Sequence, residues 1–181
     1  MASKAIGNRW NGWRIARWTI PALLLTIPLI AHFPWTGSDF VVMGVLLFGA
    51  VGIYELVARM DTSLPYRAGA AVAVATSFLL VWINLAVGII GSENNPLNLL
   101  YAAVLAVALG GTIGARFRPN GMARAMAATG AVQALVGLVA VLAAANEPPG
   151  PVGQVVLNGG FAGLWLLSAL LFRTSARAVA A

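Results

Sequence analysis

The sequence contains no cysteine and only one histidine, His32, in 181 residues. The absence of cysteine excludes disulfides, thiolate metal sites and a cysteine nucleophile. Charged residues make up only 9% of the chain and hydrophobic residues 60%, whereas a soluble domain carries about 25% charged residues. Water is therefore not the main solvent of this protein's surface.

Sequence signatures of catalysis are also missing. The chain has no G-x-x-x-x-G-K-[ST] phosphate loop, no H-E-x-x-H zinc motif and no G-x-S-x-G nucleophile motif. It also lacks the paired acids or histidines on one helix face that an enzyme acting on lipid would need. We therefore expect no enzymatic activity, no metal and no cofactor. A haem or pigment on His32 would need far more sequence context than this chain offers.

Six apolar segments are each long enough to cross a bilayer as a helix, which takes about 20 residues. They are predicted at roughly 15–35, 38–58, 68–91, 97–115, 123–145 and 153–172. Each must be helical, because lipid cannot satisfy backbone N–H and C=O groups. The predicted fold is all-α, a single bundle of six transmembrane helices over residues 15–172.

The basic residues all fall on one side of this predicted bundle. They lie before or at the start of the first segment, after the second, between the fourth and the start of the fifth, and after the sixth. These residues are Lys4, Arg9, Arg14, Arg17, Arg59, Arg67, Arg116, Arg118, Arg124, Arg173 and Arg177. The positive-inside rule makes that side cytoplasmic, with both termini inside. The formal charge of +6 is therefore explained by the orientation of the protein in the membrane. We expect the lipid bilayer as a partner and no nucleic acid.

The two ends of the chain are predicted to be short and cytoplasmic. Residues 1–14 form an interfacial segment, in which Trp10 and Trp13 beside Arg9 and Arg14 set the depth in the membrane. Residues 173–181 form a tail. No A-x-A-like cleavage site follows the first apolar segment, so we expect it to be retained.

Small residues recur at four-residue spacing in three of the predicted segments. The faces are Ala106-Gly110-Gly114, Gly130-Ala134 and Gly159-Gly163. Such faces allow helix backbones to approach closely, although membrane helices are rich in glycine in any case. Together they favour a tight bundle over an open pore.

Six polar residues form a candidate outward-facing site at the outer level of the bundle. They are His32, Asn84, Glu93, Asn94, Asn98 and Asn158. Intramembrane polar residues are candidates for function, but asparagines also join helices structurally, at about 0.6 kcal/mol each. In the turn 92–96, asparagine can also cap the helix that Pro96 begins. The sequence leaves a binding site and helix capping open as alternatives.

Four stretches of the chain resemble a family of small bacterial inner-membrane proteins of unknown function. They are SDFVVMGVLLFGAVGIYEL at 38–56, VWINLAVGIIGSENNPLNLLY at 81–101, ARFRPNGMARAM at 115–126 and LNGGFAGLWLLSALLFR at 157–173. The resemblance implies a multi-pass protein of the bacterial cytoplasmic membrane. It implies no activity, ligand or cofactor.

Two functions are compatible with these features. The favoured one is a non-enzymatic accessory or structural membrane protein that associates with other membrane-protein subunits or with itself. Small-residue faces, tiny connections and the lack of buried charge support it. The alternative is a small-solute or ion transporter or channel that uses the polar site, although such proteins usually show repeats or broken helices at mid-membrane.

Overall fold

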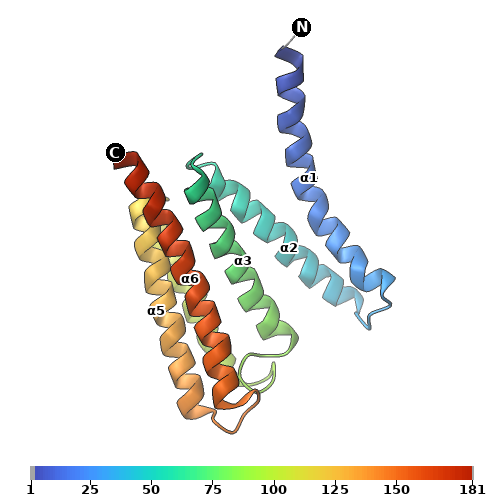
Figure 1. The fold of residues 1–181 in the computed structure, drawn as a ribbon. Helices are drawn as coiled ribbons and strands as arrows, with labels where there is room; N and C mark the ends of the chain where they lie inside the picture. The colour runs from blue at the N-terminus through green and yellow to red at the C-terminus, as the bar shows by residue number, and fades with distance from the viewer. Residues whose placement is uncertain (1–2, 181) are drawn as a thin grey trace. The chain divides into compact units, whose positions relative to one another are not determined.

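The computed structural model describes the backbone of residues 3–180 and the side chains of residues 17–178. Within that range the chain forms six α-helices, one short 3-10 helix and no strand, so the predicted all-α class is confirmed (Figure 1). The chain divides into two compact units, residues 1–55 and residues 56–181. The predicted interfacial segment 1–14 lies outside the residues whose side chains are described.

The first unit contains α1 (Ser3–Ile30) and most of α2 (Gly37–Ala58). The side-chain contacts that join these helices include an aromatic pair, an ion pair and the Arg17 guanidinium 5.8 Å from the centroid of the Tyr54 ring. The Trp18 ring stacks on the Phe48 ring with centroids 6.3 Å apart. Arg17 Nη1 donates to Glu55 Oε1 at 3.1 Å, an ion pair that is largely shielded from water. The expected lack of buried charge is therefore wrong at Glu55, which is buried. The charge of Glu55 is compensated by Arg17 within this unit, as a carboxylate in an apolar setting requires.

The turn between α1 and α2 is held by a reciprocal cap. The Thr36 backbone N–H and its hydroxyl both donate to Asp39 Oδ2 at 2.7 Å, and Asp39 N donates back to Thr36 Oγ1 at 3.4 Å. This arrangement satisfies donors that are otherwise unpaired at a helix start. Asp39 therefore has a structural role in this turn.

The second unit contains four long helices that run alternately up and down. They are α3 (Leu64–Ala86), α4 (Leu100–Gly114), α5 (Pro119–Ala143) and α6 (Gly150–Ala180), with the 3-10 helix η1 (Pro96–Leu99) leading into α4. Helix α6 packs against α3 and α5, and α4 packs against α5. These three helix pairs are antiparallel (Figure 1).

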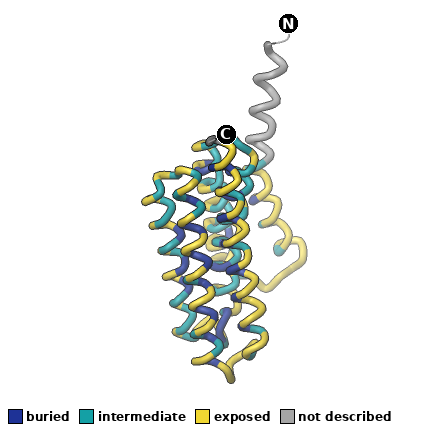
Figure 2. The backbone as a smooth tube through the Cα atoms, turned by 60° about the vertical axis from the view of Figure 1, so that its left-hand side comes forward, coloured by how far each residue is buried: buried dark blue, intermediate teal, exposed yellow. Residues whose placement is uncertain are grey.

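The core of the second unit lies along the facing sides of these helices, as the dark blue stretches in Figure 2 show. Tyr66, Leu80, Tyr101, Trp165 and Phe172 are among its fully buried side chains. The Tyr66 and Phe172 rings meet edge to face with centroids 5.0 Å apart. Many large aliphatic side chains face outward instead, including Leu135, Leu142 and Leu170. Outward apolar surface of this extent suits helices surrounded by lipid.

Five helical stretches of the described chain are long and apolar enough to cross a membrane. They are Gly37–Ala58, Leu64–Ala86, Pro96–Gly114, Pro119–Ala143 and Gly150–Ala178. They correspond to five of the six predicted segments, so the chain has the character of a multi-pass membrane protein. The described apolar part of α1, Arg17–Ile30, is about 21 Å long at 1.5 Å per residue, less than a hydrocarbon core of about 30 Å.

The small-residue faces are used differently from the prediction. A Cβ atom added at Gly110, Gly114, Gly159 or Gly163 would meet nothing within 4 Å, so the predicted faces on α4 and α6 are wrong as packing surfaces within the described chain. Gly130 does pack closely, since a Cβ there would lie 3.3 Å from Trp165 Cβ. Spacing alone identifies small residues, but the rotation of each helix decides which of them face a neighbour.

Candidate functional site

Four polar side chains meet in the core of the second unit and form a polar cluster, defined here as Tyr101, Gln133, Gln154 and Asn158. All four are at most 2% exposed. Tyr101 Oη and Gln133 Nε2 each donate to Asn158 Oδ1 at 2.9 Å. Asn158 Nδ2 donates to the Gln154 backbone oxygen at 3.0 Å and to Gln154 Oε1 at 3.1 Å. One asparagine amide therefore joins α4, α5 and α6.

The polar cluster continues into the irregular segment between α3 and α4, residues 87–99. Gln154 Nε2 donates to the Ile89 backbone oxygen at 2.8 Å. Ile89 and Ile90 are themselves buried, so their backbone groups need partners other than water. Ile89 N and Ile90 N both donate to Asn98 Oδ1, at 3.2 and 3.0 Å. The side chains of Gln154 and Asn98 thus supply the hydrogen bonds that a helix would otherwise provide.

Asn98 is the centre around which the 87–99 segment folds. Its Nδ2 donates to the Ile90 oxygen at 3.1 Å and to the Ser92 oxygen at 2.7 Å. Gly88 has φ 73°, and a Cβ there would lie 2.4 Å from the Ser92 carbonyl carbon. Only glycine fits this left-handed position so close to another backbone. Helix α3 therefore ends at Ala86 rather than at the predicted residue 91.

The same segment is tied to the connection between α5 and α6. Gly91 N donates to the Pro148 oxygen at 2.7 Å. Gly91 has φ 68°, and a Cβ there would lie 2.8 Å from Glu147 Oε2. Asn95 Oδ1 accepts from Leu97 N at 3.0 Å and caps the 3-10 helix. The two connections at this end of the second unit thus form one hydrogen-bonded layer.

Three buried polar atoms of the second unit have no hydrogen-bond partner within the described part of the chain. They are Asn84 Oδ1, Gln133 Oε1 and Trp165 Nε1. Two are acceptors and one is a donor, and a buried group without a partner costs about 1–3 kcal/mol. The α5–α6 interface holds both Gln133 and Trp165. One buried acceptor and one buried donor of that interface are therefore left without a described partner.

The six predicted site residues take part in four separate arrangements. Asn158 lies in the polar cluster, and Asn98 organises the 87–99 segment, to which the cluster is linked through Gln154 and Ile89. Among the described residues, Asn84 Nδ2 donates to the Leu80 oxygen of its own helix, at 2.7 Å.

The remaining three predicted residues are on the surface. Asn94 Nδ2 donates to Glu93 Oε1 at 2.9 Å, and both side chains are exposed. His32 belongs to the first unit, where it is exposed in the α1–α2 turn with φ 50°. The described hydrogen bonds thus link Asn158 to Asn98, and Glu93 to Asn94, rather than joining all six.

Tyr101, Gln133 and Gln154 were not among the predicted site residues. Gln154 and Asn158 are one helical turn apart on α6, which is the spacing that places two side chains on one face. That spacing was the available signal for Gln154. Tyr101 gave no signal, because a tyrosine in an apolar segment is also typical of a membrane interface.

The charged residues of the second unit are separated to its two ends. Its arginines lie where α3 and α5 begin and α4 and α6 end, at Arg59, Arg67, Arg116, Arg118, Arg124, Arg173 and Arg177. Glu93 and Glu147 lie in the two connections at the opposite end. Asp61 is the described acid on the arginine side, and its Oδ1 accepts from Ser63 N at 2.7 Å.

The residues with described side chains contain no group of three or more histidines, cysteines or carboxylates placed to hold a metal ion. The polar cluster itself offers amide and phenol groups. No family model matches the chain, and no curated protein and no solved structure matches it either. Its function must therefore be argued from its own geometry.

Proposed function

We propose that this protein is a non-enzymatic accessory or structural subunit of the bacterial cytoplasmic membrane, with both termini in the cytoplasm. The observation that carries the proposal is the use of the polar cluster. Its described N–H and O–H groups donate to one another's side chains, to the Gln154 backbone oxygen and to the Ile89 carbonyl. Such a cluster braces helices, which is the common structural role of asparagine and glutamine in membrane bundles.

The second support is the broad apolar exterior. Five helical stretches can cross the membrane, yet few of their residues are buried within the chain itself. Helix surfaces of this kind are available to neighbouring membrane proteins or to further copies of the chain. The resemblance of four stretches to small bacterial inner-membrane proteins supports the compartment.

Co-purification from native membranes tests this proposal. The chain would carry an affinity tag at its chromosomal locus, be released with a mild detergent and be analysed by quantitative mass spectrometry. We expect one membrane protein, or additional copies of this chain, in a fixed ratio close to a small whole number. A matched purification with an unrelated tagged multi-pass protein controls for non-specific capture. Recovery of a single copy without any stoichiometric companion would contradict the proposal.

A small-solute or ion transporter is the alternative, and one observation favours it. Gln133 Oε1 and Trp165 Nε1 are buried in the second unit and have no hydrogen-bond partner among the residues that the structure describes. A transporter that uses these atoms should show solute uptake in proteoliposomes that Gln133→Leu abolishes. The accessory proposal predicts no such uptake by the reconstituted chain alone.

A further inference from the structure

Five arginines gather at the end of the second unit where α5 begins and α6 ends. They are Arg116, Arg118, Arg124, Arg173 and Arg177, and all five are exposed. No described carboxylate forms an ion pair with any of them. Asp61, the described acid of this unit at that end, already accepts from Ser63 N at 2.7 Å and from Ser175 Oγ at 3.5 Å. The positive charge of these arginines is therefore left for an anion from outside the chain.

The packing of α5 on α6 sets these arginines level with one another. Gly137 faces Asn158, and Gly130 faces Trp165. The same antiparallel register, continued toward the C-terminal end of α6, places Arg118 level with Arg177. It places Arg124 within one helical turn of Arg173. Like charges so placed repel each other, and the repulsion is relieved when an anion lies between them.

One face of α6 changes from apolar to basic along its length. Leu166, Leu170, Arg173 and Arg177 follow one another at spacings of four, three and four, so they share a face. Leu166 and Leu170 are 49% and 58% exposed. A Cβ at Gly130 would lie 3.4 Å from Leu166 Cδ2, so this face borders α5. An apolar stripe that ends in guanidinium groups matches a phospholipid, with an acyl chain below and a phosphate above.

We infer that this face binds an anionic phospholipid, with its phosphate held by the arginines of the α5–α6 pair and its acyl chain along Leu166 and Leu170. Guanidinium groups bind phosphate oxygens in pairs of parallel hydrogen bonds. The free backbone N–H groups at the start of α5, which has no side-chain cap, add positive potential at the same place. The inference holds for an accessory protein and for a transporter alike.

Native mass spectrometry of the full chain in a neutral detergent tests this inference. The probes are phosphatidylglycerol, phosphatidylcholine with the same acyl chains, and inorganic phosphate. We expect phosphatidylglycerol to bind at least tenfold more tightly than phosphatidylcholine, and inorganic phosphate to leave phosphatidylglycerol binding unchanged. Each arginine near an anionic headgroup contributes about fivefold in affinity, so Arg118→Gln with Arg177→Gln should weaken phosphatidylglycerol binding about 25-fold.

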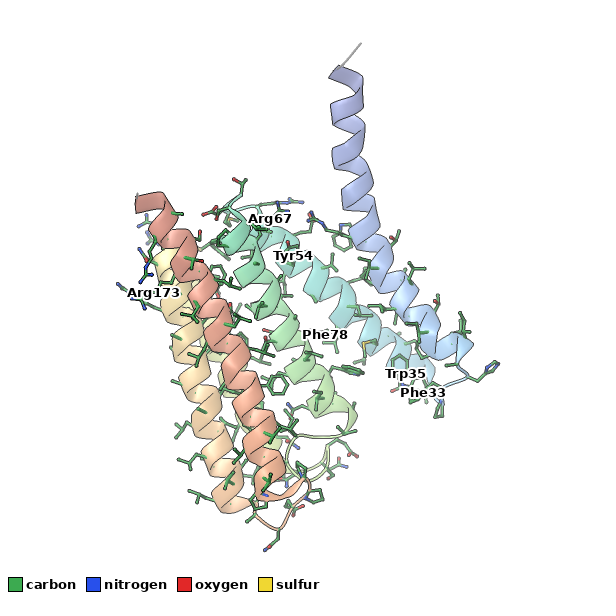
Figure 3. All side chains as sticks on the ribbon, viewed as in Figure 1. Phe33, Trp35, Tyr54, Arg67, Phe78 and Arg173 are labelled. Atoms are coloured by element: carbon green, nitrogen blue, oxygen red, sulfur yellow. The ribbon has the colours of Figure 1, made fainter. Side chains whose placement is uncertain are left out.

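Arg67 provides a control, because Figure 3 shows Arg67 and Arg173 on opposite sides of this end of the second unit. As single variants, Arg67→Gln should leave the affinity within twofold, whereas Arg177→Gln should weaken it about fivefold. If the first double variant does not fold by circular dichroism, Arg124→Gln with Arg173→Gln replaces it. Equal affinity for both lipids, equal loss in the control, or competition by inorganic phosphate would each overturn the inference.

Discussion

At the scale of single residues, Asn158 is the polar side chain that joins three helices of the second unit. Its amide takes part in four hydrogen bonds, with Tyr101, Gln133 and both the side chain and the backbone of Gln154. Its carbonyl accepts two donors from two other helices. Because lipid offers no replacement partners, the loss of this one amide would leave several buried groups unsatisfied at once.

Replacement of Asn158 by leucine should therefore destabilise the protein by about 1.2 kcal/mol, on the basis of about 0.6 kcal/mol for each of its two interhelical hydrogen bonds. The measurement is unfolding by sodium dodecyl sulfate in mixed micelles, followed by circular dichroism. Asn94→Leu is the matched control, because Asn94 is exposed and bonds only the neighbouring Glu93 side chain in the described structure. It should change the free energy of unfolding by less than about 0.5 kcal/mol. Equal effects of the two variants would show that the polar cluster does not brace the bundle.

At the scale of the helices, α5 and α6 approach each other closely at particular glycines. A Cβ at Gly137 would lie 2.5 Å from Asn158 Cβ, directly beside the polar cluster. Gly111 and Gly121 are similarly crowded by Ala125 and Ala115 between α4 and α5. These three glycines set the helix separations that bring the polar side chains within hydrogen-bonding distance.

Gly137→Ala should consequently push α6 away from α5 and destabilise the protein by about 1–3 kcal/mol, the usual cost of overpacking. Gly110→Ala and Gly159→Ala are the controls, because an added Cβ meets nothing at either position. Alanine is the better helix former by up to about 1 kcal/mol in water, so the controls should be neutral or slightly stabilising. Thermal unfolding in detergent distinguishes the variants. A Gly137→Ala protein as stable as its controls would contradict the observed α5–α6 separation.

At the scale of the whole molecule, the membrane topology that we propose is based on the distribution of charged residues. Arginines lie at one end of the second unit and Glu93 and Glu147 at the other. Five helical stretches can cross the membrane, whereas the described apolar part of α1 is shorter than the hydrocarbon core. The side on which the N-terminus lies therefore depends on whether α1 crosses.

Single cysteines can report this topology, because the chain has none of its own. An impermeant thiol reagent should label Ser92→Cys and Asn146→Cys in intact cells, but not Thr62→Cys or Asn120→Cys, all four being exposed positions in connections or at a helix start. If α1 crosses, Ser3→Cys should react only after the cells are permeabilised. Labelling of Ser3→Cys in intact cells would leave five spans, and labelling of Asn120→Cys would reverse the orientation.

The sequence by itself predicted the helical class, six apolar segments, of which five are helices long and apolar enough to cross a membrane, and the alternation of basic and acidic connections. These features depend on composition and on local patterns, since a run of about 20 apolar residues in lipid has helix as its stable form. Only the tertiary structure decided that Asn158 meets Tyr101, Gln133 and Gln154, and that the face of Gly110 stays open while Gly137 is crowded. Helix rotation decides those contacts, and nearly uniform apolar helices carry little periodic signal for rotation. The early end of α3 at Ala86 was equally hidden, because it depends on hydrogen bonds that the 87–99 segment receives from Asn98 and Gln154.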